Sequence, residues 1–124
     1  MAVESPEEWP RRFEQHLNSG DVEGVMELYE LDASVVAPSG ETITGRERLR
    51  HLFAGMITAK TQLHGRVVRF VTVGDVALLY TDFNGTGVDD GGKTVDIHYR
   101  AIEVLHRQAD GGWKLIVGDP NARK

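Results

Sequence analysis

The chain has no cysteine, no long apolar run and no excess of positive charge. Without cysteine it can form no disulfide framework, thiolate nucleophile or Cys-ligated metal site. The longest apolar-rich stretch, residues 75–83, has the length of a strand and not the ~20 residues that cross a bilayer. A net charge of −5 argues against binding to a phosphate backbone. We therefore expect neither a membrane nor a nucleic acid as a partner.

The composition is that of one ordinary globular domain. The 124 residues are 40% hydrophobic and 27% charged, and no repeat, linker or low-complexity tract divides them. We therefore expect a single domain over residues 1–124. The first residues lack the basic start and continuous apolar stretch of a secretion signal, so a cytoplasmic location is the expectation.

The first half of the chain carries helical patterns. Ser5 and Glu8 form a capping-box pattern in front of an amphipathic stripe, and Gly20 and Asp21 are typical of one helix ending and another beginning. The apolar face of the second helix would comprise Val22, Val25, Met26, Leu28 and Tyr29. A short strand is predicted over residues 34–38, followed by a turn. Thr44 and Glu47 then suggest a capping box for a third helix.

The second half is rich in strand patterns. Four segments, residues 63–74, 75–88, 94–107 and 112–119, are separated by the turn signals "GD", "DDGG" and "DGG". Helices followed by an antiparallel meander predict an α+β fold, with the helices packed on one face of a curved sheet.

Four stretches carry a resemblance that spans nearly the whole chain: "NSGDVEGVMELYELDASVVAP", "ITGRERLRHLF", "GDVALLYTDF" and "DGGWKLIVGD". Their order and content resemble the nuclear transport factor 2-like superfamily, within it the SnoaL-like and ketosteroid-isomerase-like group. The resemblance implies a cone-shaped, curved antiparallel or mixed β-sheet wrapped around N-terminal helices, a cystatin-like α+β barrel. It also implies a mostly apolar pocket at the open end and a homodimer formed through the outer face of the sheet.

The resemblance permits a residue-by-residue check against the steroid isomerase, which uses a carboxylate base and an oxyanion hole. The position of the base holds Ala37, and the positions of two hydroxyl-bearing tyrosines hold Phe13 and Phe53. The position of the second acid holds Glu103. Without the base and the two hydroxyl donors, we do not expect steroid isomerisation.

Strand alternation places Tyr99, Ala101, Glu103 and Leu105 on one face, which the resemblance puts inside the cone. Burial among apolar neighbours would raise the pKa of Glu103, so that it could donate a proton to a ligand. The alternative is that Glu103 pairs with an arginine across the sheet. Tyr99 is either a hydrogen-bond donor to substrate or a packing residue.

Histidines supply the candidate bases. His16 lies on the first helical stripe and His64 at the start of a strand, so each is either a pocket-facing general base or a residue without a ligand-facing role. His98 and His106 are expected on the outer face. No spacing is typical of a metal site, so no metal and no cofactor are predicted.

Two acidic residues, Asp82 and Asp119, each have two possible placements in this fold. Asp82 and Arg100 invite comparison with the Asp-Arg-Asp set of related epoxide hydrolases, but their strand parity puts them on the outer face. Asp119 either reaches the mouth of the cone or begins a turn with Pro120.

The sequence therefore favours a cofactor-free acid–base isomerase, cyclase or dehydratase acting on a small hydrophobic, polyketide-like or aromatic molecule. Its candidate catalytic residues are Glu103, His16, His64 and Tyr99. Its expected pocket residues are Phe13, Leu17, Tyr29, Val35, Ala37, Phe53, Ile57, Leu79, Thr81, Phe83, Ala101 and Leu105. The alternatives are a non-catalytic ligand-binding or dimerisation module, and a protein-docking module.

Overall fold

The computed structural model of the chain describes residues 3–37 and 39–123. Its elements follow the predicted order of helices first and long strands afterwards. They are η1 (Pro6–Glu8), α1 (Trp9–Asn18), α2 (Val22–Met26), β1 (Tyr29–Val36), β2 (Thr42–Thr44), α3 (Arg46–Thr58), β3 (Gln62–Val73), β4 (Val76–Val88), β5 (Thr94–Arg107) and β6 (Trp113–Asp119). The predicted α+β class is confirmed.

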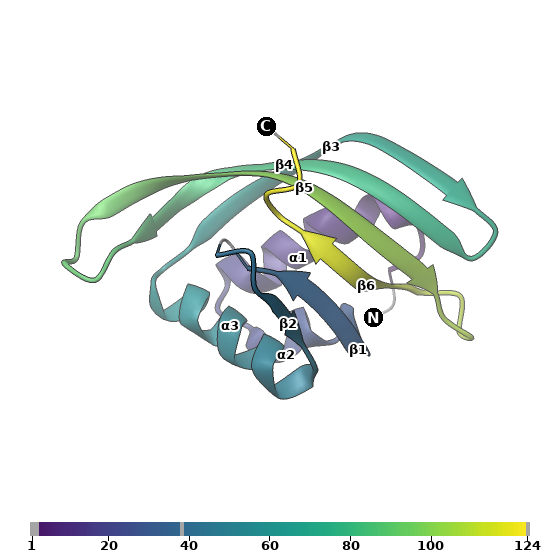
Figure 1. Cartoon of the computed structure of the whole chain (residues 1–124), viewed down its shortest axis with the longest axis horizontal. Coiled ribbons are helices and arrows are strands. Elements are labelled where there is room, and N and C mark those ends of the chain that lie inside the picture. Colours follow the sequence, from purple (N-terminus) through teal and green to yellow (C-terminus); the bar gives the residue numbers. More distant parts are fainter. Residues whose placement is uncertain (1–2, 38, 124) are drawn as a thin grey trace.

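One sheet of six strands has the order β2-β1-β6-β5-β4-β3. All neighbours are antiparallel except β1 and β6, which run parallel. The sheet is strongly curved and ends in the two edge strands β2 and β3, so it forms an open cone and does not close into a barrel (Figure 1). Register shifts in β3, β5–β6 and β1–β6 contribute to this curvature, because a bulge bends and twists the strand that carries it.

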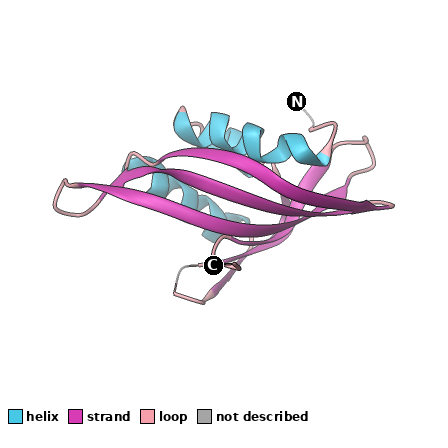
Figure 2. Ribbon diagram, turned by 90° about the horizontal axis from the view of Figure 1, so that it is seen from above, coloured by secondary structure: helices cyan, strands magenta, loops and turns pink. Residues whose placement is uncertain are grey.

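The three helices cover one face of the sheet, as Figures 1 and 2 show. Aromatic rings join the two layers: Trp9 stacks on Phe13 at 5.4 Å between centroids, and Phe13 meets Phe53 and Phe83 edge-on at 5.7 and 5.8 Å. The Trp9 indole Nε1 donates to the Leu28 carbonyl oxygen at 3.0 Å, which satisfies its buried N–H. The core thus gathers aromatic residues between the helices and the inner face of the sheet.

The predicted helix caps have mixed outcomes. Asp21 caps α2 as predicted, because its Oδ1 accepts from the Gly24 N–H at 2.9 Å. The capping boxes predicted at Ser5 and Thr44 are not formed, so these two predictions are wrong. Ser5 precedes a 3₁₀ turn and its side chain makes no cap hydrogen bond, while the N-cap of α3 is Gly45 at φ +98°, without a side chain to accept one.

The second helix is shorter than its apolar pattern suggested. It ends at Met26, and Tyr29 already begins β1, so Leu28 and Tyr29 do not belong to its face. Both side chains are buried. Burial is expected equally for a residue on the apolar stripe of a helix and for an inward-facing residue of a strand, so the sequence pattern fits both. The strand predicted over residues 34–38 is therefore the second half of β1; Pro38 lies outside the described residues. The short β2 was not predicted.

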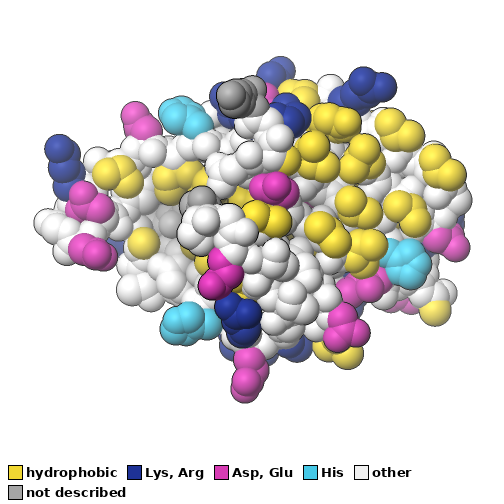
Figure 3. All heavy atoms as spheres, in the orientation of Figure 1, with side chains coloured by type: hydrophobic (Ala, Val, Ile, Leu, Met, Phe, Trp, Pro, Cys, Tyr) yellow, Lys and Arg dark blue, Asp and Glu magenta, His cyan; other side chains and the backbone are white. Residues whose placement is uncertain are grey.

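The outer face of the sheet exposes a row of apolar side chains. The register aligns Val71 with Leu78, Leu78 with Val104, and Val104 with Val117 across four strands. Val71 and Val117 are 41% and 45% exposed. In Figure 3, hydrophobic side chains gather over the right-hand half of the visible face. None of the helices in the described parts of the chain is long and apolar enough to span a membrane.

Candidate functional site

A cavity lies between the helices and the inner face of the sheet. Its volume is about 80 Å³, and its described walls are overwhelmingly apolar. They comprise Phe13, Tyr29, Val35, Val36, Ala37, Leu52, Phe53, Met56, Leu63, Phe83, Tyr99, Ala101, Glu103, Leu115, Gly118, Asp119 and Pro120. An apolar cavity of roughly 150 Å³ is enough to bind benzene, so this one suits a small group unless its walls move.

Most residues expected at a pocket do line this cavity. Those that do, from the sequence-based set, are Phe13, Tyr29, Val35, Ala37, Phe53, Phe83, Tyr99, Ala101 and Glu103. Five of the expected pocket residues do not: Leu17, Leu79, Leu105 and Thr81 are at most 1% exposed in the solid core, and Ile57 is half-buried on α3. The long inward-facing strands continue past the cavity, so the correct parity does not by itself put a residue in its wall. Thr81 contacts the site through Glu103.

Neither candidate histidine reaches the cavity, and this corrects their assignment as pocket bases. His16 turns toward the end of α1, where its Nδ1 lies 3.0 Å from Asp21 Oδ2. The His64 side chain is 88% exposed, with its Nδ1 3.4 Å from Glu14 Oε2. Strand alternation explains His64: its neighbour Leu63 points inward and lines the cavity, so His64 points outward.

Glu103 is the acid buried in the cavity wall. It lies on β5 with 5% of its surface exposed, and its Oε1 accepts a hydrogen bond from the Thr81 hydroxyl at 2.8 Å. Its other carboxyl oxygen has no hydrogen-bond partner among the described residues. No arginine among residues 3–37 and 39–123 contacts the carboxyl directly, so these residues do not form the cross-sheet ion pair that was the alternative for Glu103.

Burial controls the ionisation of this acid. Loss of solvation raises the pKa of Glu103 to about 7, opposed by the Thr81 hydrogen bond and by the positive charge of Arg123. Burial, with the charge of Glu103, also raises the pKa of Tyr29 well above its usual value, and burial raises the pKa of Tyr99. Near neutral pH both tyrosines are therefore uncharged, and Glu103 divides between its acid and its carboxylate.

Two glycines make space in and beside the cavity wall. Gly118 on β6 stands directly opposite Glu103 in the sheet register and contributes no side chain to the cavity. At Gly65, a Cβ atom would lie 2.6 Å from the ring of Phe83, which lines the cavity, so glycine lets that ring lie flat against β3.

Asp119 is at the cavity and in a turn at once. It lines the cavity at the end of β6, and its Oδ1 accepts from the Asn121 N–H at 3.0 Å. Both sequence-based alternatives for this residue are therefore realised. Asp119 and Glu103 are the only acidic residues among the described residues that line the cavity. The register pairs Asp119 with Ile102 and Glu103 with Gly118, so Asp119 reaches the cavity at the end of its strand.

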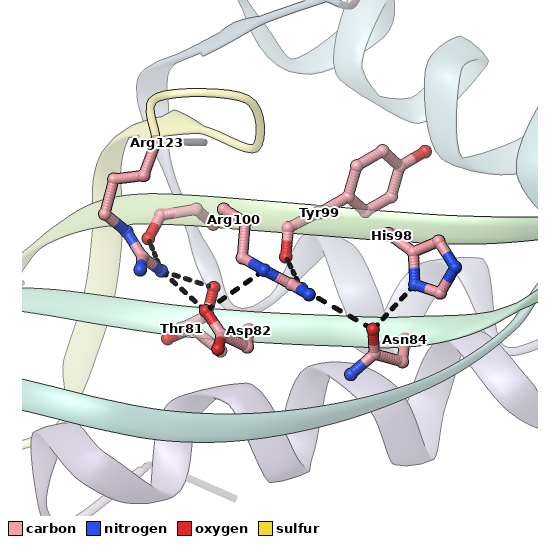
Figure 4. A network of polar contacts seen from close by, with 8 residues as sticks. Thr81, Asp82, Asn84, His98, Tyr99, Arg100 and Arg123 are labelled. Atoms are coloured by element: carbon pink, nitrogen blue, oxygen red, sulfur yellow. Dashed lines mark hydrogen bonds and ion pairs between the residues drawn. The ribbon is translucent and has the colours of Figure 1, made fainter.

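A polar network of residues from β4, β5 and the C-terminal segment lies on the outer face of the sheet (Figure 4). Arg123 Nη2 lies 2.9 Å from Asp82 Oδ1 and also donates to the carbonyl oxygens of Thr81 and Ala101. Arg100 Nε lies 4.0 Å from the same Asp82 oxygen. Asp82 and Arg100 thus lie on the outer face, as their parity predicts, and do not enter the cavity.

Other polar outer-face residues continue this pattern. His98 Nδ1 lies 2.8 Å from Asn84 Oδ1, and His106 Nδ1 lies 2.7 Å from Glu30 Oε1. Within residues 3–37 and 39–123, no group of three His, Asp or Glu side chains has the arrangement to hold a metal ion.

Comparison with known proteins identifies the family. The SnoaL-like domain profile matches residues 11–116, most of the chain. The chain belongs to the SnoaL-like domain family. No curated protein matches the sequence.

Solved structures share the fold of this SnoaL-like domain. A ketosteroid isomerase-like protein from Erwinia carotovora atroseptica aligns with a TM-score of 0.80 at 17% identity, covering 91% of this chain and 89% of its own. A proposed dehydratase of the NTF2-like family from Streptomyces avermitilis aligns at 0.73 and 21% identity, covering 93% of each chain. An NTF2-like protein with a cystatin-like fold from Novosphingobium aromaticivorans aligns at 0.75 and 17% identity, covering 91% of this chain and 76% of its own. This SnoaL-like domain therefore has the fold of these three structures.

Sequence reasoning missed part of the site. Leu52, Met56 and Leu115 line the cavity as ordinary members of apolar patterns, so only the packing distinguishes them from other core residues. Arg123 follows the last strand and carries no periodic signal. A single arginine near the end of a chain does not reveal that it folds back onto the sheet.

Proposed function

We propose that this SnoaL-like domain is a cofactor-independent acid–base enzyme acting on a small hydrophobic molecule, by isomerisation, cyclisation or dehydration. The observation that carries the proposal is Glu103: a carboxyl 5% exposed, hydrogen-bonded through one oxygen only, in the wall of an apolar cavity. A pKa of about 7 suits a group that must both hold and release a proton near neutral pH.

In this proposal Glu103 is the acid and Asp119 the base. Glu103 donates its proton to a carbonyl or hydroxyl oxygen of the ligand, and Asp119 accepts a proton from the adjacent carbon. The product of these two transfers on a ketone is the enol, and reversal at another carbon completes an isomerisation. The hydroxyl groups of Tyr29 and Tyr99 supply further neutral donors in the same cavity. Its volume of about 80 Å³ is too small for a multi-ring polyketide.

Proton exchange at carbon tests this function without knowledge of the natural substrate. Cyclopentanone in D₂O exchanges its α-protons for deuterium, which ¹H NMR follows directly. We expect the wild-type protein to accelerate the exchange with saturation kinetics. Glu103→Gln should slow it about 100-fold or more, the usual contribution of a positioned general acid. Glu41→Gln is the matched control, because Glu41 is exposed and pairs with Arg48 on the surface.

A specific observation favours a second candidate, a non-catalytic ligand-binding module. Ala37, Phe13 and Phe53 line the cavity with apolar groups where the steroid isomerase carries its base and hydroxyl donors. A protein that binds cyclopentanone in the cavity but leaves its α-proton exchange at the solvent rate would support this candidate over the enzyme.

The exposed row on the outer face supports a further proposal, a homodimer formed through that face. Val71, Leu78, Val104 and Val117 present a continuous apolar surface on four adjacent strands. Contiguous exposed apolar surface of this kind is typical of an interface between protein chains.

A further inference from the structure

The cavity has a charge character that narrows its ligand. Its described lining contains the carboxyl of Glu103, a second acidic residue, Asp119, and five aromatic residues, but no lysine, arginine or histidine. We propose that the molecule bound here carries a cationic amine attached to a compact apolar body. This inference rests on the proposal that the cavity is the ligand site and adds the class of the ligand. It does not rest on the role of Glu103 as the acid, because a bound ammonium group holds Glu103 as its carboxylate.

The first argument is the unpaired side of Glu103. The side chain is 95% removed from solvent, and only its Oε1 has a partner, the Thr81 hydroxyl. The remaining oxygen faces a cavity whose other walls are mainly hydrocarbon and aromatic carbon. Among the described residues, Arg123 Nε is the only fully buried side-chain nitrogen or oxygen atom without a partner, so this Glu103 oxygen is open to the cavity and within reach of a ligand. An ammonium N–H is a strong donor to such a carboxyl oxygen.

The second argument is the arrangement of the rings. Tyr29 and Phe53 lie 5.1 Å apart between centroids, and Phe13 lies 5.7 and 5.8 Å from Phe53 and Phe83. All four rings line the cavity, as does Tyr99. A cation within about 6 Å of an aromatic face is attracted by the negative charge of that face. The rings therefore favour the same sign of ligand charge as the carboxyl groups do.

The third argument is the position of the nearest positive charge. Arg123 lies on the opposite face of the sheet, where Asp82 and two backbone carbonyl oxygens hold its Nη2 (Figure 4). Its charge acts on Glu103 through the sheet but offers no donor inside the cavity. An anionic ligand would meet Glu103 and Asp119 with no cation beside them, and so would be repelled.

Three probes of one shape and different charge test the inference: cyclopentylamine, cyclopentanol and cyclopentanecarboxylate. Titration of ¹⁵N-labelled protein at pH 7 gives their dissociation constants from amide shifts of cavity residues such as Gly118 and Ala101. We expect the amine to bind at least 10-fold more tightly than the alcohol, and the carboxylate to bind more weakly than both.

Variants separate charge from shape. Glu103→Gln keeps the size of the side chain and should reduce the preference for amine over alcohol to threefold or less. Asp119→Asn should reduce it partially, and Glu41→Gln, on the surface, should leave it unchanged.

A second measurement keeps the test informative even if Glu103→Gln folds poorly. The groups facing or acting on Glu103 are the hydroxyls of Thr81 and Tyr29, the carboxyl of Asp119 and the guanidinium of Arg123. Burial raises the pKa of Glu103 to about 7. An ammonium ion that ionises Glu103 must release its proton, so calorimetry in phosphate and in Tris should detect proton release on binding cyclopentylamine and none on binding cyclopentanol.

The outcomes distinguish this inference from the proposed function. Equal or tighter binding of the alcohol or carboxylate, or an amine preference unchanged in Glu103→Gln, would overturn the amine assignment and leave the acid–base proposal standing. Cavity resonances that respond to none of the three probes would remove the ligand site itself, and both proposals with it.

Discussion

The hydroxyl of Thr81 on β4 donates a 2.8 Å hydrogen bond to Oε1 of Glu103 on β5, inside the sheet's concave face. Both side chains are buried, at 0% and 5% exposure. This bond is the only one that the described residues give to the Glu103 carboxyl, and it favours the charged form. Thr81 therefore holds the acid in position and lowers its pKa against the larger, opposite effect of burial.

Thr81→Val removes that hydroxyl with little change of shape. Because the hydrogen bond lowers the pKa of Glu103, we expect the pKa to rise above its value of about 7. The buried oxygen left unsatisfied should also cost about 1–3 kcal/mol of stability, and more above pH 7, where the carboxylate predominates. Carboxyl ¹³C NMR measures the pKa, and urea unfolding at pH 5.5 and 8.5 measures the stability.

Thr81→Ser is the control for this pair, since it retains the hydroxyl and should keep the pKa of Glu103 close to that of the wild type. An unchanged or lower pKa in Thr81→Val would show that the hydrogen bond does not stabilise the carboxylate.

Glu103 should make the protein less stable as the pH rises. Its pKa is raised from 4.5 to about 7, so between these values the folded protein holds a proton that the unfolded chain has lost. Stability from this group is therefore full below pH 4.5 and falls until about pH 7, by on the order of 3 kcal/mol. Glu103→Gln should lose this decline, which urea unfolding at pH 5, 6, 7 and 8 would measure.

Asp21 and Glu30 have lowered pKa values, so their contribution to stability depends on pH in the opposite direction. It is lost when the pH falls below their ordinary pKa values of 3.8 and 4.5. They therefore act outside this window. Parallel profiles for wild type and Glu103→Gln between pH 5 and 8 would contradict the raised pKa of Glu103.

Strand parity explains why the position of Glu103 on the inner face was predictable from sequence. Alternation is a fixed property of extended backbone, and the turn signals at residues 74–75, 89–92 and 110–112 delimit the strands closely. Helical faces are less sharply defined. His16 lies at the edge of the α1 stripe, so its side chain reaches Asp21 and not the cavity.

Tertiary contacts explain what the sequence could not predict. Tyr29 fits a helical stripe and an inward strand position equally well, and β1 forms because β6 offers it a parallel edge. Arg123 lies beyond the last strand, where no period constrains the side chain. Its docking depends on Asp82 and on the ring of Tyr80, whose centroid lies 5.4 Å from the guanidinium carbon.

Arg123→Gln tests whether the C-terminal segment acts on the cavity through the sheet. Because the positive charge of Arg123 lowers the pKa of Glu103, we expect that pKa to rise in the variant. Loss of the ion pair with Asp82 should also reduce stability by about 1–3 kcal/mol, since both groups are largely buried. The readout is the carboxyl ¹³C titration of Glu103.

Arg100→Gln is the matched control, because Arg100 lies on the same face near Asp82 but does not contribute to the pKa shift of Glu103. A variant of Arg123 that loses stability while the Glu103 titration stays fixed would limit Arg123 to a structural role.

The proposed homodimer predicts the effect of a charge on the exposed apolar row. Val117→Glu and Val71→Glu place a carboxylate at the two ends of that row, where each valine is more than 40% exposed. Burying an unpaired carboxylate between two sheets is strongly unfavourable, so each variant should weaken the dimer at least 100-fold while the monomer stays folded. Sedimentation equilibrium measures this directly against the 13.7 kDa mass of one chain.

Leu31→Glu provides the control, because Leu31 is 68% exposed on β1 and lies outside the row. It should leave the dimer intact. A dimer that persists in both valine variants would move the interface away from this face of the sheet. A wild-type protein that sediments as a monomer at micromolar concentration would mean that the apolar row does not bring two copies of this chain together.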